Sequence, residues 1–163
     1  MRILGIDPGS RCTGYGIIED KPSLRLVAFG TIKPPKNMAL PDRLKFIYDG
    51  LCEEIQRHGP EEAAIENVFF AANAKSALIL GQARGVAVLA AANAGLHISE
   101  YPATTVKQSL VGFGRADKSQ VSSMVHILLK MKNNSTSLDA TDALALAICH
   151  SHTRRTLQKV FNS

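Results

Sequence analysis

The sequence of 163 residues is poor in cysteine and has no tryptophan, and its three cysteines are widely spaced. Because Cys12, Cys52 and Cys149 form no CxxC pair, they indicate neither a disulfide framework nor a zinc site. Reduced thiols of this kind are typical of the cytosol. The N-terminus lacks a signal-peptide pattern, and no apolar run approaches the ~20 residues that a membrane span needs. We therefore expect a soluble, cytoplasmic protein with no membrane partner.

Acidic residues are scarce in the second part of the chain. Residues 67–163 carry 10 Lys or Arg and only 4 Asp or Glu, whereas residues 1–66 carry 9 basic and 10 acidic residues. A one-sided positive charge suggests a polyanionic partner such as nucleic acid. Solvated lysine faces give the same composition, so both interpretations stay open at this point.

Hydrophobic residues make up 45% of the chain and charged residues 20%, which excludes a disordered or collagen-like protein. No repeat interrupts the sequence. Length predicts about one domain, which we place at residues 1–152. Residues 153–163 form a basic C-terminal tail that we expect to be flexible.

Hydrophobic periodicity predicts an α/β fold with a five-stranded mixed sheet flanked by helices. The expected strands are residues 2–7, 15–18, 24–32, 63–66 and 96–101. The expected helices are residues 40–58, 75–94, 117–131 and 138–150. Closely spaced strands predict an antiparallel meander at the start, and the helix between the first and fourth strands permits their parallel pairing. Regularly spaced alanines in residues 75–94 permit close approach of another element, either the chain's own sheet or a second subunit.

Four carboxylates are placed where this fold would bring them together. Asp7 and Glu66 end the first and fourth strands, and the carboxyl ends of parallel strands share one edge. Asp139 and Asp142 lie three residues apart in a helical segment and so project from one face. Gathered carboxylates repel one another unless protons or cations are present. Mg²⁺ or Mn²⁺ prefers such oxygen ligands, and two ions about 3.5 to 4 Å apart catalyse phosphodiester hydrolysis in metal-dependent nucleases.

Each acid also has a simpler interpretation. Asp7 precedes Pro8 and Gly9 and is typical of a turn, and Asp139 would complement the positive end of a helix dipole. Glu66 is harder to explain in this way, because a glutamate is unfavourable in a strand. The combination of the four therefore carries the prediction.

The same residues belong to a longer ordered pattern, which resembles the RuvC family of bacterial Holliday-junction resolvases from residue 1 to about residue 152. The matching segments are Ile6-Asp7-Pro8-Gly9, Gly14-Tyr15-Gly16, Ile65-Glu66, Gly112-Phe113-Gly114-Arg115-Ala116-Asp117-Lys118-Ser119-Gln120-Val121 and Asp139-Ala140-Thr141-Asp142-Ala143-Leu144-Ala145. The resemblance implies a ribonuclease H-like fold, a homodimer and symmetric cutting of two strands in four-way DNA junctions during recombination and repair. It also implies a branch-migration motor as a partner.

The resemblance further implies roles for individual residues. Asp7, Glu66, Asp139 and Asp142 match the family's metal-binding catalytic carboxylates. Lys107 and Lys118 match basic positions near the scissile phosphate, with Lys118 also expected in catalysis. Phe69 matches an aromatic residue that stacks on a base, and Arg115 is a further candidate for DNA binding.

Two other functions remain open from the residues alone. The first is a non-catalytic protein that binds junctions through its basic surface. The second is an actin-like or sugar-kinase-like phosphotransferase, because an Asp-x-Gly after a first strand also opens such domains. That class needs two related domains, and 163 residues are too few for both.

Overall fold

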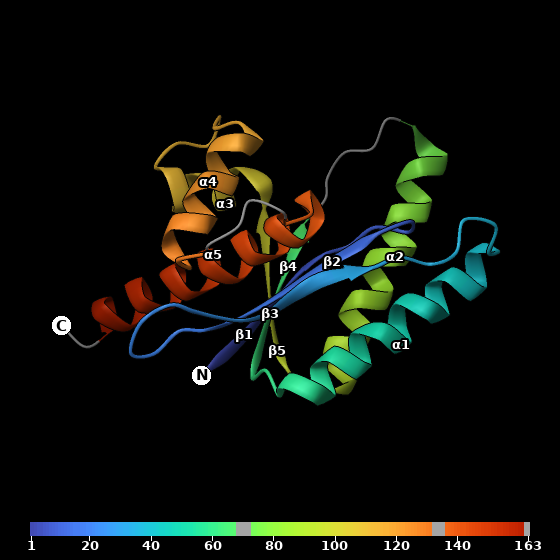
Figure 1. Cartoon of the computed structure of the whole chain (residues 1–163), viewed down its shortest axis with the longest axis horizontal. Helices are drawn as coiled ribbons and strands as arrows, with labels where there is room; N and C mark the ends of the chain where they lie inside the picture. The colour runs from blue at the N-terminus through green and yellow to red at the C-terminus, as the bar shows by residue number, and fades with distance from the viewer. Residues whose placement is uncertain (68–72, 132–135, 162–163) are drawn as a thin grey trace.

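The computed structural model describes residues 1–67, 73–131 and 136–161. A five-stranded sheet with the order β3-β2-β1-β4-β5 lies at its centre (Figure 1). Its strands are β1 (Arg2–Asp7), β2 (Thr13–Glu19), β3 (Arg25–Ile32), β4 (Glu62–Asn67) and β5 (His97–Pro102). The first three strands pair in antiparallel fashion, and β1-β4 and β4-β5 pair in parallel. The five-stranded mixed sheet predicted from the sequence is confirmed.

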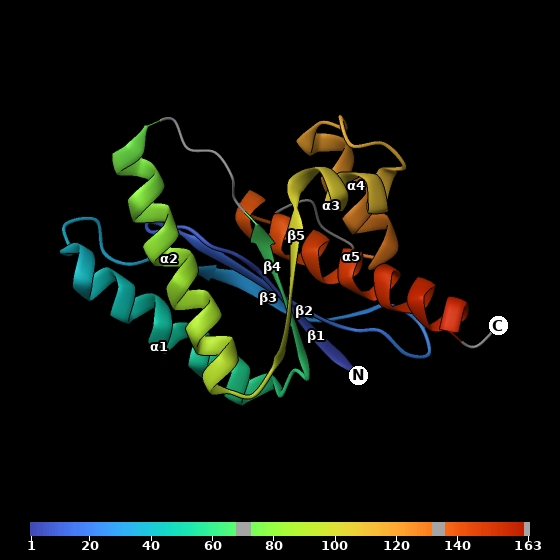
Figure 2. The same cartoon turned by 180° about the vertical axis from the view of Figure 1, so that it is seen from behind.

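Two layers of helices cover the sheet. The helices are α1 (Leu40–His58), α2 (Ala74–Asn93), α3 (Ala103–Val111), α4 (Lys118–Leu128) and α5 (Leu138–Phe161). Figures 1 and 2 show α1 and α2 on one side of the sheet and α5 across the other, with α3 and α4 beside α5. Each layer buries its own apolar cluster, one centred on Ile3, Leu144 and Ile148 and the other on Ile6 and Leu51.

Local signals in the sequence account for several helix boundaries. Gly59 ends α1 with φ 55°, a left-handed conformation that glycine adopts without steric cost. Asp117 caps α4: its side chain accepts from the backbone N–H of Gln120, and the Gln120 side chain accepts from the Asp117 N–H. This reciprocal pair is the capping box predicted from the sequence.

Helix boundaries also differ from expectation in two places. The sequence pattern does not predict helix α3, because its nine residues directly follow β5 with no polar cap between them. The pattern places the end of α5 near His150, yet the helix continues to Phe161, so most of the predicted basic tail is helical. Contacts favour this extension, since Arg154 lies 3.1 Å from a Glu62 carboxylate oxygen and Arg155 donates to the Asp20 carbonyl.

Helix α2 is apolar on more than one face. Its regularly spaced alanines, including Ala83, Ala87 and Ala90, are buried within the chain's own fold, where α2 contacts α1, β4 and β5. Leu78 and Leu89 on another side remain 70% and 51% exposed. Among the described residues, α2 alone is long and apolar enough by composition to cross a membrane. Its packing against α1 and the sheet identifies it as one layer of the domain.

Glycines in β1 and β2 allow α5 to lie directly on the strand backbones. A Cβ atom at Gly14 would lie 2.0 Å from the carbonyl oxygen of Asp139, and one at Gly5 would lie 1.9 Å from that of Ala143. No side chain other than hydrogen fits at either position. The register pairs Gly14 with Asp7, so this close approach brings the first turn of α5 next to the end of β1.

Replacing Gly14 by alanine is expected to lower the free energy of unfolding by about 1 to 3 kcal/mol, because the added methyl group must push α5 away from β2. Chemical denaturation at equilibrium measures this change. Gly114→Ala is the control, because its Cβ would lie 3.4 Å from the nearest heavy atom, an ordinary contact distance. Equal stability of Gly14→Ala and the control would contradict the tight contact.

Candidate active site

Strands and helices place acidic and basic side chains around one cavity of about 120 Å³ at the carboxyl ends of β1 and β4. The pairing of Ile6 with Ile65 makes Asp7 and Glu66 the next residues on adjacent parallel strands. The described polar residues that line the cavity are Asp7, Glu66, Asp142, Lys107 and Lys118. Five elements, β1, β4, α3, α4 and α5, therefore contribute to one site.

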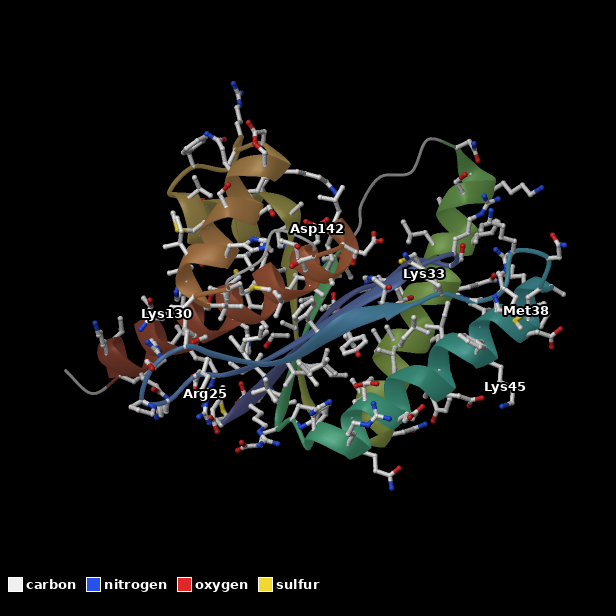
Figure 3. The ribbon with its side chains drawn as sticks, in the orientation of Figure 1. Arg25, Lys33, Met38, Lys45, Lys130 and Asp142 are labelled. Carbon is white, nitrogen blue, oxygen red and sulfur yellow. The ribbon has the colours of Figure 1, made fainter. Side chains whose placement is uncertain are left out.

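Asp142 and Asp139 come from the first turn and a half of α5. Asp142 lines the cavity directly, and Figure 3 shows it at the start of α5, above the end of the sheet. Asp139 lies one turn earlier, where its Oδ2 accepts a hydrogen bond from Cys12 Sγ at 2.9 Å. Asp139 is thus beside the cavity but outside its lining, although its charge reaches Asp7.

Burial and mutual repulsion change the protonation of the acids. The pKa of Asp7 is raised from 3.8 to about 8, first by burial and then by the negative charges of Glu66, Asp142 and Asp139. Burial also raises the pKa of Glu66, with Asp142 as the next cause, while a hydrogen bond with Asp7 opposes this rise. With a pKa of about 8, Asp7 retains a proton at neutral pH, and a hydrogen bond links it to Glu66.

Lys118 is the positive charge that partly offsets this repulsion. Its Nζ lies 2.9 Å from Asp142 Oδ2, and this hydrogen bond is the main reason why the pKa of Lys118 is raised. Its positive charge also opposes the rise in the pKa values of Asp7 and Glu66 without cancelling it. The capping box at Asp117 fixes the start of α4 and so holds Lys118 at the rim of the cavity.

The donor set fits a hard divalent cation. Four carboxylates supply only oxygen ligands, as Mg²⁺ and Mn²⁺ prefer, and the negative charges of three of them add to burial in raising the pKa of Asp7. In the part of the chain that the structure describes, no three acidic, His or Cys side chains already surround one point as metal ligands do. Asp142 accepts a hydrogen bond from Lys118 and Asp139 accepts one from Cys12, so a cation bound by these acids would have to replace those hydrogen bonds.

The predicted DNA-binding residues fall in different places. Lys107 lines the cavity from α3 beside Lys118. Arg115 is exposed on the loop between α3 and α4 and does not line the cavity. Phe69 lies outside the described residues. The structure therefore brings two of these four residues to the carboxylates.

Two residues that position the site were missed from the sequence. Arg84 of α2, whose side chain is 23% exposed, donates from Nε to the Glu66 carbonyl at 3.1 Å and forms an ion pair with Glu100 at 2.6 Å. Cys12 donates a hydrogen bond to Asp139. Burial is the main cause, and the Asp139 carboxylate the next, of the rise in the pKa of the Cys12 thiol to about 11. Neither belongs to a sequence motif, because each acts on a residue distant in the chain.

The sheet, the helix lying across it and the acidic cavity define the chain as a ribonuclease H-like nuclease. The family model described as "Crossover junction endodeoxyribonuclease RuvC" matches residues 3–150. The chain belongs to this family.

Named relatives of the chain support the same assignment. Over 153 residues it is 52% identical to the crossover junction endodeoxyribonuclease RuvC of Halorhodospira halophila, covering 94% of this chain and 91% of the relative. It is 54% identical to that of Pseudomonas fluorescens over 156 residues, covering 95% and 88%. The structure "T. thermophilus RuvC in complex with Holliday junction substrate" matches with a TM-score of 0.90 and 32% identity, covering 96% of each chain.

The protonation of Asp7 predicts how stability depends on pH when metal is removed. Because its folded pKa of about 8 exceeds the ordinary value of 3.8, this group binds protons more tightly in the folded state. The contribution of this group to the free energy of unfolding is complete below about pH 4 and is lost as the pH rises toward 8. With EDTA present, the melting temperature should fall across this range, and Asp7→Asn should flatten the decrease.

Saturating Mg²⁺ should raise the melting temperature of the wild type more at pH 8 than at pH 5, since the cation competes with the proton. Thermal unfolding followed by circular dichroism measures both effects. Asp49→Asn, which removes an exposed acid of α1, is the control and should keep the wild-type pH dependence. If Asp7→Asn kept the wild-type pH dependence of the melting temperature, Asp7 would not be the group with the raised pKa.

Proposed function

We propose that this protein resolves four-way DNA junctions by metal-dependent hydrolysis of a phosphodiester in each of two opposed strands. The observation that carries this proposal is the convergence of Asp7, Glu66 and Asp142 in one cavity together with Lys118. Family membership over residues 3–150 gives it direct support. The junction itself is proposed as the substrate because the similar T. thermophilus RuvC forms a complex with a Holliday junction substrate.

Asp7, Glu66, Asp139 and Asp142 would hold the cation, Mg²⁺ with Mn²⁺ as a substitute, with two ions in each subunit. Bound divalent cations supply a hydroxide at neutral pH and stabilise the negative charge of the leaving oxygen. The chain must provide four ionised carboxylates for this purpose. Asp7 must therefore release the proton that it retains in the absence of a cation.

The lysines act on the phosphate rather than on the cation. Lys107 and Lys118 face the same cavity as the carboxylates, so a phosphodiester placed there meets both ammonium groups. Lys118 Nζ, which contacts Asp142, would stabilise the negative charge that develops on a phosphate in this cavity. We propose Phe69 and Arg115 as further DNA contacts, with Phe69 stacking on a base.

Cutting two opposed strands in symmetry requires two sites, and we propose that a homodimer supplies them. Leu78 and Leu89 are exposed on α2, and Gly81 and Gly85 lie between them at helical spacing. Small residues between large apolar ones allow a second helix to pack closely. This exposed apolar strip is our candidate for the dimer interface. We further propose a cytoplasmic location and a branch-migration motor as a partner.

The catalytic proposal is tested by incubating a four-way junction with Mg²⁺ and the wild type or Asp7→Asn. The wild type should cut two opposed strands. The variant should bind the junction with similar affinity yet cut more slowly by over about a hundredfold, because even the loss of an outer partner of a metal ligand costs 10- to 100-fold. Gel separation of the products measures the rates.

Asp49→Asn serves here too as the control for removal of a carboxylate and should cut at the wild-type rate. Equal cutting by Asp7→Asn would exclude Asp7 from the metal site. Binding without any cutting by the wild type, with either Mg²⁺ or Mn²⁺, would instead favour a non-catalytic junction-binding protein.

The dimer proposal predicts that Leu89→Glu becomes monomeric, because a charge in the apolar strip would be buried without a partner on association. Sedimentation equilibrium measures the mass. Leu157→Glu on α5 is a matched control, since both leucines are 51% exposed, and it should remain dimeric. A wild type that is monomeric at every concentration tested would overturn this proposal.

A further inference from the structure

A second cavity, of about 530 Å³, lies outside the carboxylate site. Six residues line it, four of them cationic and none acidic: Arg11, Lys33, Pro34, Pro35, Lys36 and Arg43. We refer to it as the basic pocket. Arg11 comes from the β1-β2 loop, the residues from 33 to 36 from the segment after β3, and Arg43 from the first turn of α1.

The basic pocket and the carboxylate site share one end of the sheet. Asp7 pairs with Gly14 of β2, and the neighbouring Thr13 pairs with Ile32, the last residue of β3. Gly14 in turn pairs with Thr31, so Lys33 lies two strands away from Asp7 and two residues beyond it, at least about 10 Å away. Figure 3 shows Lys33 at this end of the sheet, between Asp142 and Met38. Its charge also reaches Cys12, the residue that holds Asp139.

The charges of the basic pocket are not neutralised by any acidic residue that the structure describes. Among the residues that the structure describes, no carboxylate forms an ion pair with Arg11, Lys33, Lys36 or Arg43. Arg43 Nε is moreover buried without a hydrogen-bond partner in this part of the molecule. The four cations of the pocket thus have no anionic partner among the described residues.

Helix α1 adds to the positive potential. It begins at Leu40, so its N-terminal N–H groups and Arg43 both belong to the turn beside the pocket. The positive end of a helix favours anions. Asp42 lies in the same turn and offsets part of this potential, but it does not line the pocket.

We propose that the basic pocket binds backbone phosphates of the DNA arm that extends from the carboxylate site over the ends of β2 and β3. This inference rests on the proposed function, because it assigns a second contact to the same substrate. Guanidinium and ammonium groups contact phosphate oxygens and carry no base-specific information. The pocket therefore increases affinity and orients the arm without contributing to sequence preference.

The test measures junction affinity by fluorescence anisotropy in an Asp7→Asn background, with Lys33→Gln and Lys36→Gln added together. Both lysines are exposed, so the fold should tolerate the changes. The control adds Arg25→Gln and Lys45→Gln, which remove the same charge from positions outside the pocket, labelled in Figure 3. Titrations are repeated between about 50 and 200 mM salt.

The pocket variant should bind roughly tenfold more weakly, and its slope of log affinity against log salt should decrease by about 1.8, the value for two lost phosphate contacts. The control should change affinity less than twofold. Inorganic phosphate at low concentration should leave this difference between the two proteins unchanged. Loss of the difference in phosphate would indicate a site for a small anion and overturn the proposal.

Arg43→Gln provides a second, independent test, with its folding checked by circular dichroism, and should also weaken binding of the junction. If the wild type cuts junctions and all pocket variants bind them as tightly as the control, the pocket does not contact DNA. The proposed function would then remain intact. Failure of the wild type to bind or cut junctions would instead refute the proposed function itself.

Discussion

The direct contact between α5 and the backbones of β1 and β2 is the constraint on which the site depends. Glycines at positions 5 and 14 remove the side chains that would otherwise keep the helix at a distance. As a result, the first turn of α5 reaches the end of β1, and Asp142 joins Asp7 and Glu66 in one cavity. The packing that buries the apolar side of α5 against the sheet therefore also assembles the acidic site.

This assembly has an electrostatic cost that explains the remaining features of the site. Carboxylates held together in a partly buried cavity raise one another's pKa, and Asp7 shows the largest effect. Lys118 offsets part of the repulsion through Asp142, and a divalent cation would offset the rest. A site that repels its own ionised form favours binding of an external cation, which is the property that a metal-dependent nuclease needs.

Positive charge is distributed around this acidic centre rather than within it. Lys107 and Lys118 border the cavity, and the basic pocket lies at the same end of the sheet on the other side of β2. A polyanion would otherwise be repelled by four carboxylates, so flanking cations are required to bring DNA to them. The excess of basic residues in the second part of the sequence accounts for only some of these groups, since the basic pocket comes from residues 11–43.

The sequence by itself determined the strand pattern, the capping box at Asp117 and the meeting of Asp7, Glu66 and Asp142, because these depend on local periodicity and on short motifs. It missed α3, which has no polar cap, and the extension of α5, which depends on Glu62 and Asp20 far away in the chain. Only the tertiary structure decided that Cys12 holds Asp139, that Arg84 holds the backbone of Glu66, and that Arg11, Lys33 and Arg43 share a pocket. The physical reason is that packing sets such contacts between distant segments, and no local pattern in a single sequence records which side chains will meet.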